Sequence, residues 1–196
     1  IHSKTASDIF KVNIDMVTKD MRRVAKAVNF GIIYGISNFG LSENLNISNK
    51  EAKEFIDNYL TTYPGIKNYM DETIKKAYET GCSKTMFNRK RNIEELKNTN
   101  YMIRQSGERM ALNTPIQGTS ADIIKKAMVE IYNEMKKRNL KSKMIIQVHD
   151  ELVFDIVKNK KDLVESIVSN SMKNIVKLSV PLEVSLDYGK DLYETK

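Results

Sequence analysis

The spacing of hydrophobic residues predicts a helical hairpin in the first half of the chain. Ser48 and Glu51 form a capping-box pattern, and apolar residues then recur every three or four positions. Tyr63–Pro64–Gly65 interrupts this pattern, which resumes over residues 66–78 and stops at Gly81. We therefore expect two consecutive helices joined at the proline.

Further helices are predicted on both sides of this hairpin. Residues 1–20 are typical of a short helix and a loop. A helix should cover residues 101–113 and break at Thr114–Pro115, because proline cannot donate a helical hydrogen bond. A longer helix should begin at Thr119 or Ser120, with Asp122 close behind its N-terminus.

Two apolar runs rich in β-branched residues predict an antiparallel hairpin later in the chain. They cover residues 144–148 and 152–156, and only His149–Asp150–Glu151 separates them. A helix with apolar positions from Val164 to Val176 should follow, and then a third strand over residues 182–186. The pattern predicts an α+β protein that is mostly helical and ends in a small antiparallel sheet.

The segment from residue 22 to residue 35 carries candidate chemistry. As a helix, it places Arg22, Lys26, Phe30 and Tyr34 on one face. Cationic side chains bind phosphate oxygens and aromatic faces accept a base or a sugar, so this face suits a nucleotide. Without other information, the pattern is more typical of a basic amphipathic helix with aromatics in the core, and this alternative stays open.

Charge favours an anionic partner. The 196 residues are 41% hydrophobic, which is enough for a core, and they carry a formal net charge of +7. Nucleic acid is the natural partner, and a soluble basic protein is the alternative. A basic cluster of Lys84, Arg89, Lys90 and Arg91 falls in a polar, irregular segment over residues 83–100. We expect a solvated loop there that could touch nucleic-acid phosphates.

Several classes of protein are disfavoured by what the sequence lacks. The one cysteine, Cys82, cannot form an internal disulfide. No apolar run approaches the ~18 residues of a membrane span. The sequence contains no Gly-Lys-Ser or Gly-Lys-Thr phosphate loop, which argues against a P-loop nucleotidase.

Two strings resemble motifs of one enzyme family. The positions Arg22, Lys26, Phe30-Gly31 and Tyr34-Gly35 completely match motif B of the family A DNA polymerases, the bacterial DNA polymerase I type. The string Gln147-Val-His-Asp-Glu-Leu-Val-Phe is similar to motif C of the same family. Both motifs occur in the family's order and at about its spacing, and the resemblance covers essentially the whole chain.

The resemblance implies a role for each residue of the nucleotide motif. Arg22 and Lys26 would neutralise the β and γ phosphates of a dNTP, with Lys26 donating a proton to pyrophosphate. Phe30 and Tyr34 would pack on the sugar and the nascent base pair. His2 lies in a string similar to the family's Ile-His-(two residues)-Thr-Ala signature and would face the triphosphate.

A second set of residues concerns DNA. Amide side chains near a helix break suit minor-groove acceptors, although the residues alone favour capping of the helix at the proline break. Through the resemblance, Arg109, Asn113 and Gln117 would contact the primer–template, and His149 would lie near the primer end.

The hairpin tip is the candidate metal site. An Asp in a turn commonly binds its own backbone, but a carboxylate fixed at a rigid tip also suits a hard cation such as Mg²⁺. The resemblance makes Asp150 a metal ligand and Glu151 an auxiliary carboxylate. With Lys26, these are the expected catalytic residues.

The function implied is template-directed transfer of a dNTP to a primer 3′-hydroxyl with two Mg²⁺ ions. In the family, motif A bears another essential aspartate and normally precedes motif B by several tens of residues. It is absent from these 196 residues and is therefore expected before Ile1. The chain also starts without Met, so we expect a piece of a longer protein. We therefore expect a fragment that is inactive alone, with fingers over residues 1–100 and the remaining fingers helices and the C-terminal palm over residues 101–196.

Two other functions stay open at this point. They are a single-subunit RNA polymerase of the phage type and a basic nucleic-acid-binding module without catalysis. The expected partners are primer–template DNA and dNTPs, without a membrane, and the protein is expected to be monomeric. The expected location is a bacterial cytoplasm or nucleoid, or an organelle such as an apicoplast-like plastid.

Overall fold

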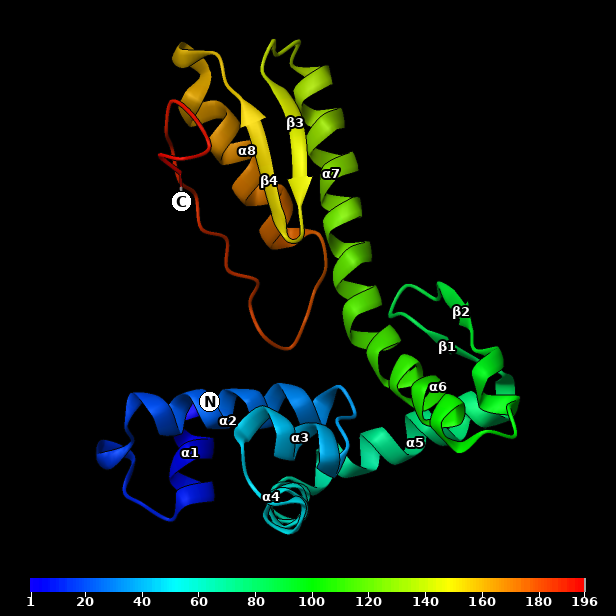
Figure 1. Ribbon diagram of the computed structural model, residues 1–196. Helices are drawn as coiled ribbons and strands as arrows, with labels where there is room; N and C mark the ends of the chain where they lie inside the picture. Colours follow the sequence, from blue (N-terminus) through cyan, green and yellow to red (C-terminus); the bar gives the residue numbers. More distant parts are fainter. Residues whose placement is uncertain (196) are drawn as a thin grey trace. The chain divides into compact units, whose positions relative to one another are not determined.

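The computed structural model describes residues 1–195 and divides into two compact units. The first unit comprises residues 1–118, and the second begins at Thr119. Helices dominate both units, and each unit contains one antiparallel hairpin (Figure 1). The α+β prediction is confirmed.

The first part of unit 1 is built of helices around one apolar cluster. These elements are α1 (His2–Phe10), the 3₁₀-helix η1 (Ile14–Met16), α2 (Lys19–Ile33), α3 (Asn38–Leu45), α4 (Asn49–Thr62) and α5 (Pro64–Thr80). Their shared core consists of Val28, Ile32, Leu41, Ala52 and Tyr59. The small and aliphatic side of α2 is therefore the side that packs.

Local signals set the ends of these helices. The predicted capping box forms at the start of α4, where the Glu51 N–H donates to the Ser48 Oγ and the Glu51 carboxylate accepts from the Ser48 backbone. Gly81 ends α5 in the left-handed region with φ 65°. Helix α3 was not predicted from the sequence. It begins at Asn38, three residues after Gly35, and the Ser37 side chain before it caps the Gly40 N–H.

The second part of unit 1 corrects the prediction of an irregular loop over residues 83–100. The chain there forms the antiparallel hairpin of β1 (Cys82–Lys84) and β2 (Lys90–Asn92), followed by the 3₁₀-helix η2 (Glu94–Lys97). Ile93 and Leu96 join a small core with Ala77 and Ala111. The two strands are only three residues long, too short for a period-two pattern to show in the sequence.

The proline junction is a wide helical turn. Helix α6 (Tyr101–Asn113) passes into the π-helical turn η3 (Thr114–Gly118), after which α7 (Thr119–Lys137) begins. Pro115 has no N–H, so the carbonyl of Ala111, four residues earlier, loses its usual helical donor. The Ser83 Oγ on β1 donates to this buried carbonyl at 2.9 Å. The hairpin that the sequence did not predict therefore satisfies the group that proline leaves unpaired.

Unit 2 places one hairpin beside two helices (Figure 1). Strand β3 (Lys143–Val148) pairs with β4 (Glu151–Asp155), and the 3₁₀-helix η4 (Lys158–Lys160) leads into α8 (Lys161–Asn174). The core consists of Ala127, Ile131 and Met135 from α7 with Val164, Ile167 and Val168 from α8. Met144, Leu152 and Phe154 of the hairpin pack against it. Both predicted strands and both predicted helices are present.

The predicted third strand is wrong. Residues 182–186 are not assigned to a strand, and the sheet has two strands. Leu182, Val184 and Leu186 are nevertheless half-buried, whereas Glu183 and Ser185 between them are exposed. The alternation correctly predicted which side chains face inward, but a strand also requires backbone hydrogen bonds to a neighbour, and this segment has none in the described chain.

We expect Ser83→Ala to destabilise unit 1 by about 1–3 kcal/mol, because the buried Ala111 carbonyl would lose its donor. Urea unfolding monitored by circular dichroism measures the change. Ser106→Ala, a serine partly exposed on α6, is the matched control and should change stability by less than about 0.5 kcal/mol. Equal effects of the two changes would show that the Ser83 hydrogen bond contributes nothing.

Candidate functional site

One face of α2 collects the predicted nucleotide residues. Arg22 and Lys26 are exposed, and neither forms an ion pair with any residue of the described chain. The Lys26 ammonium lies 6.0 Å from the centre of the Phe30 ring, and the Phe30 and Tyr34 rings are stacked with centroids 6.2 Å apart. The face therefore offers two available cations next to two aromatic rings.

The exposure of these rings decides between the two interpretations of α2. Phe30 is 44% exposed, whereas Val28 and Ile32 on the opposite side are at most 2% exposed. Phe30 is therefore not a core residue. A large exposed aromatic side chain beside unpaired cations fits a binding surface better than a solvated amphipathic helix.

His2 joins this face from α1. Its ring centroid is 5.7 Å from that of Phe30, and its Nδ1 lies 2.9 Å from the Asn29 Nδ2. Partial burial, together with the nearby Arg22 guanidinium, lowers the pKa of His2 below the usual histidine value. The structure thus brings together all five residues predicted for nucleotide binding.

Asn29 was not predicted from the sequence. It is only 4% exposed and lies on the side of α2 that meets α1. An asparagine at a buried helical position is the one signal that could have indicated it, because a buried amide requires partners.

The predicted DNA residues lie on α6 and the π-helical turn. Arg109 is half-buried beside the turn that follows α2, where a Cβ built on Gly35 would lie 3.2 Å from the Arg109 Cγ. Gly35 also has φ 73°, a backbone conformation that favours glycine. Position 35 therefore requires glycine both for this conformation and for the close approach of Arg109. A cleft of about 190 Å³ opens here, lined by Gly35, Ile36, Ser37, Met70, Ile74, Gln105, Glu108, Arg109 and Leu112.

Asn113 and Gln117 differ in their surroundings. The Asn113 Oδ1 is buried and has no hydrogen-bond partner among the described residues, so this side chain does not cap the proline junction. Gln117 is exposed. Arg89 supports the turn that carries Gln117, because its guanidinium donates to the Gly118 carbonyl at 3.0 Å.

The small hairpin of unit 1 concentrates positive charge. Lys84 lies directly opposite Lys90, and Arg91 is opposite Ser83. Lys84, Lys90 and Arg91 are exposed, and none forms an ion pair within the described chain. Like charges opposite one another destabilise a ladder, so this pairing is more readily explained by an anionic partner than by folding.

The hairpin tip of unit 2 presents its ionisable residues to solvent. His149 and Asp150 form the two-residue turn, and Glu151 is the first residue of β4, opposite Val148. The Gln147 side chain donates to the His149 carbonyl at 2.9 Å, and His149 has φ 53°. The Asp150 carboxylate accepts no hydrogen bond within the described chain, so it does not serve as the usual turn-stabilising Asp.

Oxygen donors at this tip fit a hard cation. Within residues 1–195, however, no group of three or more His, Cys, Asp and Glu side chains could hold a metal ion. Asp150 and Glu151 therefore form a partial metal site at most.

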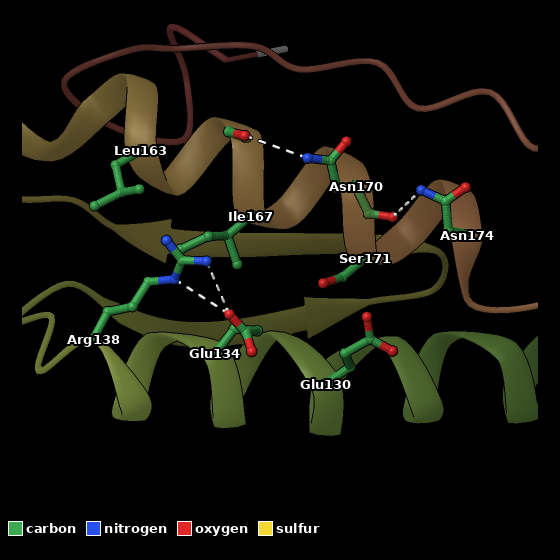
Figure 2. A pocket seen from close by; sticks show the side chains of 9 residues that line it. Glu130, Glu134, Arg138, Leu163, Ile167, Asn170, Ser171 and Asn174 are labelled. Atoms are coloured by element: carbon green, nitrogen blue, oxygen red, sulfur yellow. Dashed lines mark hydrogen bonds and ion pairs between the residues drawn. The ribbon is translucent and has the colours of Figure 1, made fainter.

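A second cleft, of about 280 Å³, lies between α7 and α8 (Figure 2). Its main polar feature is Glu134, whose Oε2 accepts from the Nε and Nη2 of Arg138 at 3.2 and 3.1 Å. None of the predicted site residues lines it. The Arg138 guanidinium in this cleft is already paired with the Glu134 carboxylate, so it is not free to bind a phosphate.

The motifs and the fold together point to one protein family. Residues 1–194 match the model of DNA polymerase family A, and the chain belongs to this family. The resemblance seen in the sequence is therefore confirmed.

Individual relatives support the same assignment. The chain is 52% identical over its full length to DNA polymerase I of Caldicellulosiruptor bescii and 48% identical to that of Bacillus subtilis. It spans 23% and 22% of these curated relatives. Both organisms are bacteria, which gives the apicoplast alternative no support. In the described chain, no helix is long and apolar enough to cross a membrane.

A solved structure is similar over nearly the whole chain. It is the POL domain of Pol1 from M. smegmatis in complex with a DNA primer–template and dNTP. The TM-score is 0.91 at 40% sequence identity, over 99% of this chain and 34% of that one.

The assignment of Phe30 to a surface can be tested by stability. We expect Phe30→Ala to cost about 1 kcal/mol or less, because Phe30 is 44% exposed and does not belong to the apolar cluster on the other side of α2. Ile32→Ala, two residues away and 2% exposed, should cost about 2–5 kcal/mol. Urea unfolding of both variants measures the difference, and comparable losses would contradict the surface assignment.

Proposed function

We propose that this chain provides the dNTP-binding and primer–template-binding parts of a template-directed DNA polymerase. The observation that carries the proposal is the α2 face. There His2 meets the exposed Phe30 ring, the half-buried Tyr34 ring and two cations that form no ion pair within the described chain. The relatives support it, since they are DNA polymerases at 40–52% identity. This similarity favours the DNA enzyme over a phage-type RNA polymerase.

The chemistry of the α2 face suits a bound dNTP. Arg22 and Lys26 carry the charges that offset the β and γ phosphates, and Lys26 is the proton donor to the departing pyrophosphate. Phe30 and Tyr34 offer ring faces to the sugar and the nascent base pair. His2 adds a donor toward the triphosphate. No side chain of the described part of the chain competes for the two cations.

Family A polymerases generally use divalent metal ions, and we assign Asp150 as a Mg²⁺ ligand with Glu151 as the auxiliary carboxylate. Bound Mg²⁺ ions in such sites lower the pKa of the attacking hydroxyl and neutralise the leaving group. The open Asp150 carboxylate and the rigid two-residue turn fit this role. Because the described residues form only a partial site, we propose that this chain alone does not polymerise.

Primer–template contacts come from two parts of unit 1. Arg109, Asn113 and Gln117 supply donors and acceptors that suit the minor groove, and the buried, unpartnered Asn113 Oδ1 supports a role beyond packing. The exposed cations of the β1–β2 hairpin suit backbone phosphates. His149 contributes near the primer end. In family terms, residues 1–100 form the fingers and residues 101–196 the remaining fingers helices and the C-terminal palm.

The direct test is binding of a fluorescent dATP analogue to the 196-residue chain with Mg²⁺. We expect Arg22→Ala to weaken binding by roughly tenfold or more, because a charge-assisted phosphate contact is lost. Arg23→Ala removes the same charge one residue away, where the guanidinium pairs with Asp20 at 3.3 Å, and should change affinity by less than about twofold.

Equal losses in the two variants would show non-specific charge attraction and would overturn the assignment of the α2 face. No binding by the unmodified chain under conditions where it is folded would also contradict the proposal.

A further inference from the structure

The Asn29 amide joins α2 to α1 through two hydrogen bonds. Its Nδ2 lies 2.9 Å from the His2 Nδ1 and 3.1 Å from the Thr5 Oγ1. Asn29 and Thr5 are 4% and 2% exposed, and the Asn29 Oδ1 is buried without a partner among the described residues. The Asn29 amide thus forms hydrogen bonds through both N–H groups of its Nδ2 and none through its oxygen.

The orientation of this amide follows from Thr5. The Thr5 hydroxyl has one proton, which it donates to the Ile1 carbonyl at 3.3 Å. Its oxygen can therefore only accept from Asn29, which must present its NH₂ group. The second proton of that group then points to the His2 Nδ1, which must accept it. A neutral imidazole that accepts at Nδ1 carries its own proton on Nε2.

We propose that Asn29 is a positioning residue for the nucleotide site: it holds His2 as the neutral Nε2–H tautomer, so that Nε2–H is the donor offered to a triphosphate. The nucleotide part of this inference rests on the proposed function, whereas the tautomer does not. Asn29 precedes Phe30 on α2, so the same residue also fixes His2 against the ring 5.7 Å away.

The charges around His2 agree with a neutral ring. Partial burial lowers the pKa of His2, and the positive charges of Arg22, the Ile1 amino group and Lys26 lower it further. A second proton on the ring would have to enter at Nδ1 and would break the hydrogen bond from Asn29. The neutral form therefore has a structural as well as an electrostatic cause.

The test is nitrogen-15 NMR of the imidazoles in the 196-residue chain. The protein has two histidines, and His149, exposed at the hairpin tip, is an internal reference. We expect His2 of the unmodified chain to be the Nε2–H tautomer and to titrate below the usual ~6.5. A His2 proton on Nδ1 at neutral pH would overturn the proposal without any variant.

Asn29→Asp keeps the shape but replaces the donor by an acceptor. We expect its carboxylate to draw the His2 proton to Nδ1 and to raise the pKa of His2, while the His149 signals stay unchanged. An unchanged His2 spectrum in Asn29→Asp would contradict the proposal.

Nucleotide binding separates positioning from a structural role. His2→Ala and Asn29→Ala should each weaken Mg²⁺-dATP binding by roughly three- to tenfold, and the double variant should be no weaker than His2→Ala. Additive losses would show that Asn29 does not act through His2. If the unmodified chain binds no dATP while His2 shows the expected tautomer, the proposed function fails and the positioning of His2 by Asn29 stands.

Discussion

The packing of one side of α2 determines what the opposite side can offer. Val28 and Ile32 are buried in the core that α2 shares with α3 and α4, which fixes the rotation of the helix about its axis. Because residues four apart lie nearly above one another, this rotation turns Arg22, Lys26, Phe30 and Tyr34 outward together. A change that rotated α2 would therefore disperse these four side chains. The proposed chemistry therefore depends on ordinary apolar burial by residues that contact no ligand.

Buried polar side chains support this arrangement where a backbone group or a residue of the site would otherwise lack a hydrogen-bond partner. Ser83 satisfies the carbonyl that Pro115 leaves unpaired, and Asn29 links α2 to the helix that carries His2. Both contacts join segments that are far apart in sequence. Gly35 serves the same purpose sterically, since its left-handed conformation and missing side chain allow the end of α2 to approach Arg109. The nucleotide face and the first of the proposed DNA residues are thus held within one unit.

Long periodic elements and tight turns were predictable from the sequence, whereas features created by tertiary contacts were not. The α2 stripe and the hairpin around Asp150 show their spacing directly in the residues. Helix α3 and the β1–β2 hairpin are short, and the hairpin is stabilised by partners that are distant in sequence, such as Ala111 for Ser83. The strand expected over residues 182–186 shows the converse. Its inward and outward side chains alternate as expected, but no strand among the described residues pairs with it. Asn29 escaped prediction because its partners lie 24 and 27 residues away.

The central claim is that these residues supply nucleotide and DNA binding and one metal-binding carboxylate to a polymerase. The most direct measurement is primer extension by a chimera in which these 196 residues replace the matching segment of Bacillus subtilis DNA polymerase I, which is 48% identical. We predict that the chimera extends a primer with Mg²⁺ and dNTPs and that Asp150→Asn abolishes extension while primer–template binding remains. Undiminished extension by Asp150→Asn, or a folded chimera that binds primer–template but adds no nucleotide, would contradict the account.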